Sequence, residues 1–177
     1  MDRLTLDTNT LRDWAWCENL SSETRYPSEP QKRDELIPKF KLLAQFANQG
    51  ICELGVSNQV YTDYGEDVLP ENISKLIKVY ITSFSSISTF PMTFPFTFIE
   101  DDQIEDILSV VFPQSIPEHK QYKSNRNDAL QLLAHKMSER EFFITSDKEI
   151  MRAQLILEEK FGIKVLSLSE YISLKTK

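Results

Sequence analysis

Near its start the sequence reads Arg3-Leu4-Thr5-Leu6-Asp7-Thr8-Asn9, a short apolar strand that stops at polar side chains. Asp and Asn at such a stop favour turns and helix starts. Comparable short strands are predicted at 51–56, 141–145 and 164–167. Between them, apolar residues recur at helical spacing, which predicts helices near 36–47, 69–81, 104–111, 130–137 and 150–157. Strands that alternate with helices predict an α/β fold, with a mainly parallel sheet covered by helices on both faces.

The length of 177 residues suits a single domain that spans residues 1–177. The region from about 65 to 123 is interpreted as an enlarged or inserted part of that domain. It contains a segment rich in Phe, Ser, Thr and Pro, 84–98, for which extended structure and a hairpin both stay open. This segment either packs on the domain or forms a dimer or partner surface. A polar stretch with two prolines, 18–33, predicts a loop.

The net charge of −7 argues against broad, charge-driven binding of nucleic acid. It does not exclude local binding where cations load an acidic cluster. No apolar run approaches the roughly 20 residues that span a bilayer, and the start lacks the pattern of a signal peptide. The two cysteines, Cys17 and Cys52, are predicted to be reduced core thiols. We therefore expect a cytoplasmic protein that does not enter a membrane.

Four aspartates are predicted to lie at one edge of the sheet. Asp7 follows the first strand directly, and Asp147 follows the strand at 141–145. Asp63 lies six positions beyond the end of the second strand, and we expect it on the second turn of a helix. Asp128 is expected to open the helix that leads into the third strand. Ligands bind at the carboxyl ends of the strands in parallel sheets, so we expect the four carboxylates to meet there.

Carboxylates that converge repel one another, and burial raises their pKa values further. A hard divalent cation such as Mg²⁺ or Mn²⁺ removes that cost, because it prefers oxygen ligands and accepts phosphate oxygens. Such ions activate water and stabilise the leaving oxygen of a phosphodiester. The pattern therefore indicates a metal-binding, catalytic set made of Asp7, Asp63, Asp128 and Asp147. Taken singly, each acid also has a structural reading as a turn residue, a helix cap or a solvated helix residue.

The same stretches resemble the motifs of the PIN-domain family. The first motif is matched by Leu4-Thr5-Leu6-Asp7-Thr8-Asn9, and the second by the run from Val56 to Asp63, where the family usually has Glu at the last position. The third is similar to Asn127-Asp128-Ala129-Leu130 and the fourth to Ile144-Thr145-Ser146-Asp147. The interval of 19 residues between the last two acids is similar to the family's. The resemblance covers roughly residues 4–64 and 124–170.

This resemblance implies a three-layer α/β/α fold and an endoribonuclease that hydrolyses RNA with Mg²⁺ or Mn²⁺. Many bacterial members resemble VapC toxins, which a cognate antitoxin inhibits, and others act in RNA processing or quality control. The implied substrate is RNA. Whether the protein also binds an antitoxin or another protein partner, or forms a homodimer, stays open.

Residues around the acids have two readings each. The Thr145 hydroxyl orients a carboxylate or a water, or the residue is an ordinary β-branched strand residue. The side chain of Asn9 holds the first aspartate or contacts substrate, or it caps the first helix. Three cations precede the third acid, and they either grip phosphates or belong to a solvated loop: Lys120, Lys123 and Arg126.

Functions of other classes remain as alternatives. A phosphatase of the haloacid-dehalogenase type would need Asp-x-Asp-x-Thr after the first strand, but this chain has Asn9 and Leu11 at the second and third of those places. A receiver domain would arrange its acids differently. A non-catalytic PIN-like domain that binds RNA or protein is compatible with the Asp63 departure and the negative charge. Trp14 and Trp16 offer base stacking, although we expect core or interface roles for them.

Overall fold

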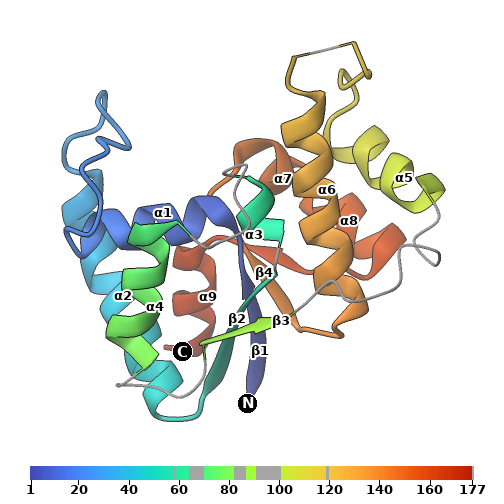
Figure 1. Ribbon diagram of the computed structural model, residues 1–177. Helices are drawn as coiled ribbons and strands as arrows, with labels where there is room; N and C mark the ends of the chain where they lie inside the picture. The colour runs from blue at the N-terminus through green and yellow to red at the C-terminus, as the bar shows by residue number, and fades with distance from the viewer. Residues whose placement is uncertain (58, 64–69, 82–86, 91–100, 119, 177) are drawn as a thin grey trace.

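A computed structural model describes the chain apart from residues 58, 64–69, 82–86, 91–100, 119 and 177 (Figure 1). Its strands form one sheet in the order β3-β2-β1-β4-β5, and every neighbouring pair is parallel. The strands are β1 (Asp2–Leu6), β2 (Cys52–Ser57), β3 (Ile87–Phe90), β4 (Phe142–Ile144) and β5 (Val165–Leu166). The predicted α/β fold with a parallel sheet is therefore confirmed.

Strand β1 lies at the centre of the sheet and is buried on both faces: Leu4 and Leu6 lie on one face, and the fully buried Thr5 lies on the other. Leu4 and Leu6 are fully buried, and Leu4 is aligned with Leu54 of β2 and with Phe142 of β4. Short strands that are buried on both faces are typical of parallel sheets between helical layers.

The helices cover both faces of this sheet (Figure 1). They are α1 (Thr8–Cys17), α2 (Lys32–Asn48), α3 (Gln59–Thr62), α4 (Glu71–Ile81), α5 (Asp101–Val111), α6 (Tyr122–Met137), α7 (Lys148–Arg152), α8 (Gln154–Phe161) and α9 (Leu168–Lys175). The ends follow from local chemistry: Ser167 and Glu170 form a capping box at the start of α9, and Gly162 ends α8 with a positive φ of 71°. Within the described part of the chain, no helix combines the length and apolarity needed to cross a bilayer.

Each face of the sheet has its own hydrophobic core. Helices α1, α2, α4 and α9 pack on one face, where the ring of Trp14 stacks on Phe40 with 5.2 Å between centroids. Helices α5, α6, α7 and α8 pack on the other face around Phe143. Trp14 is thus a core residue, as expected, and Cys17 and Cys52 are free, buried thiols.

Two expectations about helix boundaries are wrong. Helix α6 begins at Tyr122, so Asp128 lies in its second turn rather than at its start. Helix α3 is a single turn that ends at Thr62, so Asp63 directly follows it instead of lying on a second turn. In the 84–98 segment, residues 87–90 form a strand parallel to β2, which excludes a hairpin with that neighbour, and the remainder lies outside the described residues.

One buried cation lies in the amino half of the sheet. The Arg140 guanidinium is 6% exposed and donates to the carbonyl oxygens of Leu4 (3.1 Å) and Glu53 (3.3 Å). It also forms an ion pair with the Glu53 carboxylate at 3.1 Å. Gly55 makes room for it, since a Cβ at that position would lie 2.5 Å from the Arg140 Cζ atom. The charge of Arg140 is therefore fully accommodated by its neighbours.

Candidate functional site

The strand order creates a topological switch point between β1 and β4. From β1 the chain moves outward through β2 to β3, and it then returns to the opposite side of β1 for β4 and β5. The helices that follow β1 and β4, α1 and α7, pack on opposite faces of the sheet. Connections that diverge in this way form a crevice at the carboxyl ends of the strands, where ligands bind in open α/β sheets. Asp7 and Asp147 are the first acids after these two strands.

Asp7 lies at the bottom of this crevice and is 3% exposed. Its Oδ1 atom accepts the backbone N–H of Thr10 at 2.6 Å, which caps α1, and its Oδ2 atom accepts the hydroxyl of Thr145. Burial raises the pKa of Asp7 to about 6, and the nearby charge of Asp147 adds to this, while the hydrogen bonds from Thr145 and Thr10 oppose it. The Thr145 hydroxyl therefore contacts a carboxylate, in agreement with one of its two predicted roles.

Asp147 shares Thr145 with Asp7. The backbone N–H of Asp147 donates to the Thr145 hydroxyl oxygen at 2.9 Å. The Oδ1 atom of Asp147 caps α7 by accepting the N–H groups of Glu149 (2.8 Å) and Ile150 (3.0 Å). One threonine thus fixes the carboxylate after β1 relative to the turn that carries the carboxylate after β4.

Asp63 reaches the crevice from the end of α3. Its Oδ2 atom accepts the hydroxyl of Thr8 and the side-chain amide of Gln131, the latter at 2.9 Å. Thr8 belongs to α1 and Gln131 to α6, so the carboxylate joins the two helices that border the site. Burial raises the pKa of Asp63, although hydrogen bonds and the charge of Arg12 oppose the increase.

Asp128 has a pKa that is raised further than that of Asp7. Burial raises its pKa to about 8, and the charges of Asp63, Asp147 and Asp7 contribute in that order, while Arg12 lowers it. The direction of this shift is expected for a carboxylate that is poorly solvated and has other carboxylates in its neighbourhood.

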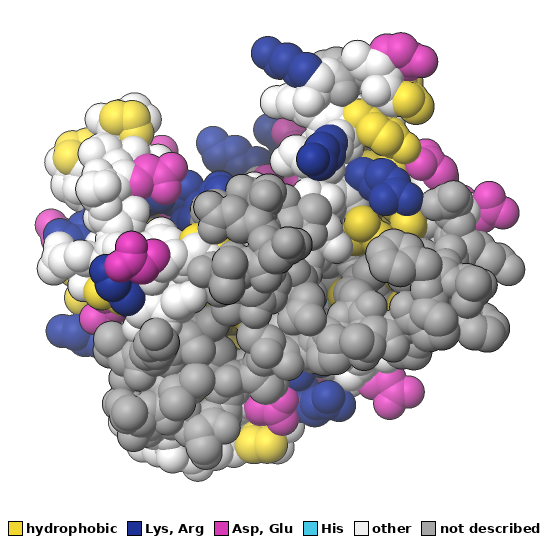
Figure 2. Space-filling view, in the orientation of Figure 1, with side chains coloured by type: hydrophobic (Ala, Val, Ile, Leu, Met, Phe, Trp, Pro, Cys, Tyr) yellow, Lys and Arg dark blue, Asp and Glu magenta, His cyan; other side chains and the backbone are white. Residues whose placement is uncertain are grey.

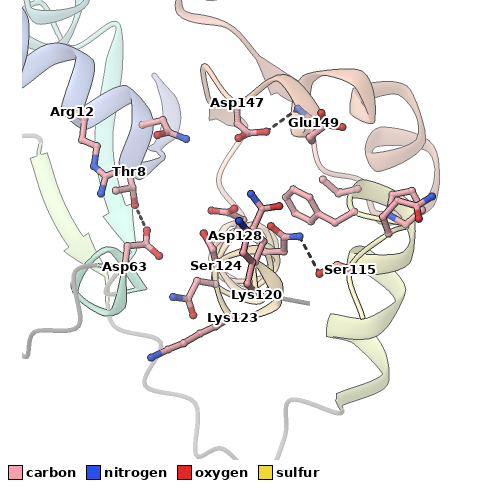
Figure 3. A pocket seen from close by; sticks show the side chains of 18 residues that line it. Thr8, Arg12, Asp63, Ser115, Lys120, Lys123, Ser124, Asp128, Asp147 and Glu149 are labelled. Carbon is pink, nitrogen blue, oxygen red and sulfur yellow. Dashed lines mark hydrogen bonds between the residues drawn. The ribbon is translucent and has the colours of Figure 1, made fainter. Parts of the chain in front are cut away.

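A pocket with a volume of about 890 Å³ opens over these acids. Figure 3 shows Asp63 on one side, Asp128 in the middle and Asp147 on another side of the space between α1, α6 and α7. These three carboxylates line the pocket together with Glu149, and Asp7 lies outside the lining, beneath it. Three of the four predicted acids therefore line one pocket, and Asp7 does not.

Basic side chains line the same pocket. Arg12 of α1 is half-buried, and Lys120 and Lys123, at the start of α6, are exposed. Figure 2 shows Lys and Arg side chains on both sides of the notch between the α1–α2 side of the molecule and the upper end of α6. Arg126, for which phosphate binding and a solvated loop were both open, lies in α6 and is not part of the pocket lining. Cations around an acidic centre are suited to a ligand that is itself anionic.

The donor set fits a hard divalent cation in its chemistry. The charged oxygens that line the pocket are carboxylates. Gln131, whose amide nitrogen contacts Asp63 from outside the lining, has a buried Oε1 atom without a hydrogen-bond partner among the described residues. Among those residues, however, no three His, Cys, Asp or Glu side chains are grouped closely enough to hold one ion together. Mg²⁺ is commonly bound through one or two carboxylates and keeps several waters, so the set is compatible with that mode.

Sequence patterns did not single out Arg12, Thr8 or Gln131. Thr8 and Gln131 are buried polar residues, and each contacts Asp63. A signal for Thr8 was its place directly after Asp7. Gln131 lies one helical turn beyond Asp128, on the same side of α6, and this spacing could have indicated it.

Hydrogen bonds hold the loop between α1 and α2 next to the site. Asp13, a buried acid of α1, accepts hydrogen bonds from Arg25 Nε (3.1 Å) and from the Tyr26 hydroxyl (2.7 Å). A terminal nitrogen of Arg25 donates to Asn9 Oδ1 at 3.4 Å, and Asn9 lines the pocket. The expected capping role of Asn9 is wrong, because Asp7 caps α1. The predicted loop therefore supports one wall of the pocket.

Comparison of the sequence with protein-family models and with curated proteins finds no match.

Proposed function

We propose that this protein is a metal-dependent endoribonuclease with a PIN-like, three-layer α/β/α fold. The observation that carries the proposal is that three aspartates distant in sequence, Asp63, Asp128 and Asp147, line one pocket together with basic side chains. Burial and the neighbouring carboxylates raise the pKa of Asp128 to about 8, which agrees with this crowding. A cluster of this kind is unfavourable unless positive charge joins it. Perturbed titration in a cleft is characteristic of functional sites.

The role proposed for each residue follows from whether its side chain lines the pocket or is buried behind it. Asp128 and Asp147 line the pocket and would hold a cation, with Asp63 beside them. Asp7 and Thr145, buried beneath, keep the turns that carry the exposed acids in place. Arg12, Lys120 and Lys123 attract the phosphodiester and offset the negative charge of the protein around it.

A bound Mg²⁺ or Mn²⁺ would supply a water of lowered pKa and neutralise charge on the phosphate. The chain itself supplies carboxylate oxygens to accept protons, and basic side chains that keep the RNA backbone over them. Without the cation, the carboxylates repel the phosphodiester that the reaction requires.

A non-catalytic PIN-like domain that binds RNA or protein is the second candidate. Two observations favour it: both oxygens of Asp7 are already engaged by Thr10 and Thr145, and no group of three potential ligands surrounds one point within the described residues. Such a protein would bind RNA through the basic side chains of the pocket without cutting it.

The test compares wild type, Asp7→Asn and Asp128→Asn on a mixed-sequence RNA, with Mn²⁺ or with excess chelator. Both substitutions preserve shape. Asp128→Asn removes a carboxylate that would hold the cation, so cleavage should fall on the order of 100-fold or more, and Asp7→Asn removes the buried carboxylate that supports the site, so cleavage should fall about 10–100-fold. The exposed acid Asp106, on α5, provides the control, since Asp106→Asn changes the net charge equally outside the pocket.

Wild-type cleavage that survives the chelator, or that is equal in all the proteins, would contradict the mechanism. If the wild type cleaves no RNA, Mn²⁺ binding in the same sample decides between the candidates. Absence of saturable Mn²⁺ binding would favour the non-catalytic domain.

A further inference from the structure

The wall of the pocket opposite α1 differs in chemistry from the acidic side. It is formed where α5 ends and α6 begins, and it contains Phe112 and Pro113 with the amides of Gln114, Gln121 and Asn125. We propose that this wall, the α5–α6 wall, binds one unpaired nucleobase of the RNA whose phosphate lies over the carboxylates. The inference rests on the proposed function and adds a substrate-binding subsite to it.

Phe112 is held as a fixed aromatic surface. Its backbone N–H donates to the carbonyl of Leu108 at 2.7 Å, and its carbonyl accepts the N–H of Ser115 at 2.7 Å. Its ring is half-buried, packs on the core beneath α5 and α6, and also lines the pocket. An aromatic side chain that is already immobilised loses little entropy when a base stacks on it.

The polar groups beside Phe112 are amides and hydroxyls rather than charges. Asn125 Nδ2 donates to Ser115 Oγ at 3.0 Å, which fixes the Asn125 amide against the end of α5 (Figure 3). Gln114 lines the pocket next to them. Neutral donors and acceptors next to an aromatic ring suit the edge and face of a nucleobase, whereas a phosphate is better matched by cations.

The cations lie where a phosphate would need them. Lys120, just before α6, and Lys123, in its first turn, line the pocket, and Asp128 follows in the next turn of the helix. One short helical segment therefore brings phosphate-binding and acidic groups next to the α5–α6 wall. The pocket volume of about 890 Å³ is within the range of about 300–1,000 Å³ that is usual for small-ligand sites, which allows a nucleoside beside the phosphate.

An unpaired base is required because a stacked, paired base does not expose its face to a side chain. Stacking on one aromatic residue contributes on the order of tenfold in affinity, with little dependence on base identity. The α5–α6 wall therefore predicts a preference for single-stranded RNA over duplex RNA, separate from any effect on the chemical step.

The experiment measures binding in Mn²⁺ of a fluorescein-labelled single-stranded RNA of about six nucleotides, a usual site size for such proteins, whose phosphorothioate linkages resist cleavage. The proteins are the wild type, Phe112→Ala, Phe112→Leu and Phe112→Trp, all in the full chain. Phe161→Ala is the matched control, because Phe161 is half-buried on the same core but does not line the pocket. A second RNA series carries one abasic nucleotide at each position in turn.

We expect Phe112→Ala and Phe112→Leu to weaken binding on the order of tenfold, while Phe112→Trp and Phe161→Ala bind like the wild type. One abasic position should cause a similar loss in the wild type and no further loss in Phe112→Leu. Equal binding by the wild type and Phe112→Leu, or equal abasic losses in both, would overturn the subsite. Absence of RNA binding by the wild type would overturn both proposals, whereas binding without cleavage would overturn only the nuclease.

Discussion

The amino half of the sheet and its carboxyl edge both bury charged groups, but the neighbours of the charged group differ in sign. In the amino half, Arg140 is surrounded by two carbonyl oxygens and the Glu53 carboxylate. At the carboxyl edge, Asp128 is surrounded by further carboxylates, and its pKa rises to about 8. The first arrangement satisfies a buried charge, and the second concentrates charge of one sign.

This difference separates a structural polar cluster from a candidate functional one. Groups that are satisfied inside the protein contribute to stability and have nothing further to bind. Groups that repel one another cost stability, and that cost is removed when a cation or proton joins them. Substitutions at the two places should therefore change stability in opposite directions.

The largest effect is expected from Arg140→Ala, which should lower the free energy of unfolding by about 3 kcal/mol. The substitution leaves the carbonyls of Leu4 and Glu53 without their donor and opens a cavity beside Gly55. Urea unfolding, monitored by circular dichroism, measures this loss of stability.

Gly55→Ala in the wild type should cost about 2 kcal/mol, because its Cβ would overlap a guanidinium that is bonded on several sides. Combined with Arg140→Ala, the same substitution should cost much less, since the overlapping group is gone. Strictly additive losses in the double variant would contradict this packing.

At the carboxyl edge, Asp128→Asn should stabilise the protein at pH 8 in a metal-free buffer, by at least about 1 kcal/mol. The folded pKa of about 8 lies above the unfolded value of about 3.9, so the folded state holds the proton more tightly. Stability conferred by that proton is fully present below the unfolded pKa of about 3.9 and is lost as the pH rises from there through the folded pKa of about 8. The melting temperature of the variant should therefore exceed that of the wild type most at pH 8, and the difference should shrink as the pH falls to about 4.

The control for this prediction is Asp106→Asn, which removes an exposed carboxylate on α5. It should leave the dependence of melting temperature on pH unchanged. If Asp128→Asn destabilises the protein at pH 8, the account of crowded carboxylates is wrong.

The smallest effect is expected from Thr145→Val, a change that keeps the shape of the side chain. It removes the hydroxyl that donates to Asp7 and accepts from the Asp147 N–H, so unfolding should become easier by about 1 kcal/mol. Thr176→Val, at an exposed helix end, is the comparison. Loss of stability that is no larger at Thr145 than at Thr176 would contradict the bridging role.

The regular part of the fold was predictable because its patterns are local. Leu4 and Leu6 in a run that ends at Asp7 indicate a buried strand and the turn after it, and the structure agrees. The start of α6 was misplaced because Tyr122 and its neighbours are polar, whereas the apolar spacing that identifies the helix becomes regular only after Asp128. The 87–90 strand was undecided because a short β-rich run has no periodicity that distinguishes a parallel partner from a hairpin.

The acids of the site were predictable from their places after strands, since parallel strands bring their carboxyl ends to one edge. Their accessibility was not, because it depends on tertiary contacts such as the hydrogen bond from Thr145 that holds Asp7 below the pocket. Arg12 and Gln131 were missed for the same reason: their positions in α1 and α6 acquire meaning only when the two helices face each other across Asp63.

The most direct test of the central claim, that the carboxylates bind a catalytic cation, is a calorimetric titration of the metal-free protein with Mn²⁺ at pH 7 and 8. We predict saturable binding that tightens as the pH rises, with release of a proton, because the cation displaces the proton held near a pKa of about 8. Asp128→Asn should weaken binding at least about tenfold, and Asp106→Asn should not change it. No saturable binding, or the same affinity in wild type and Asp128→Asn, would contradict the account.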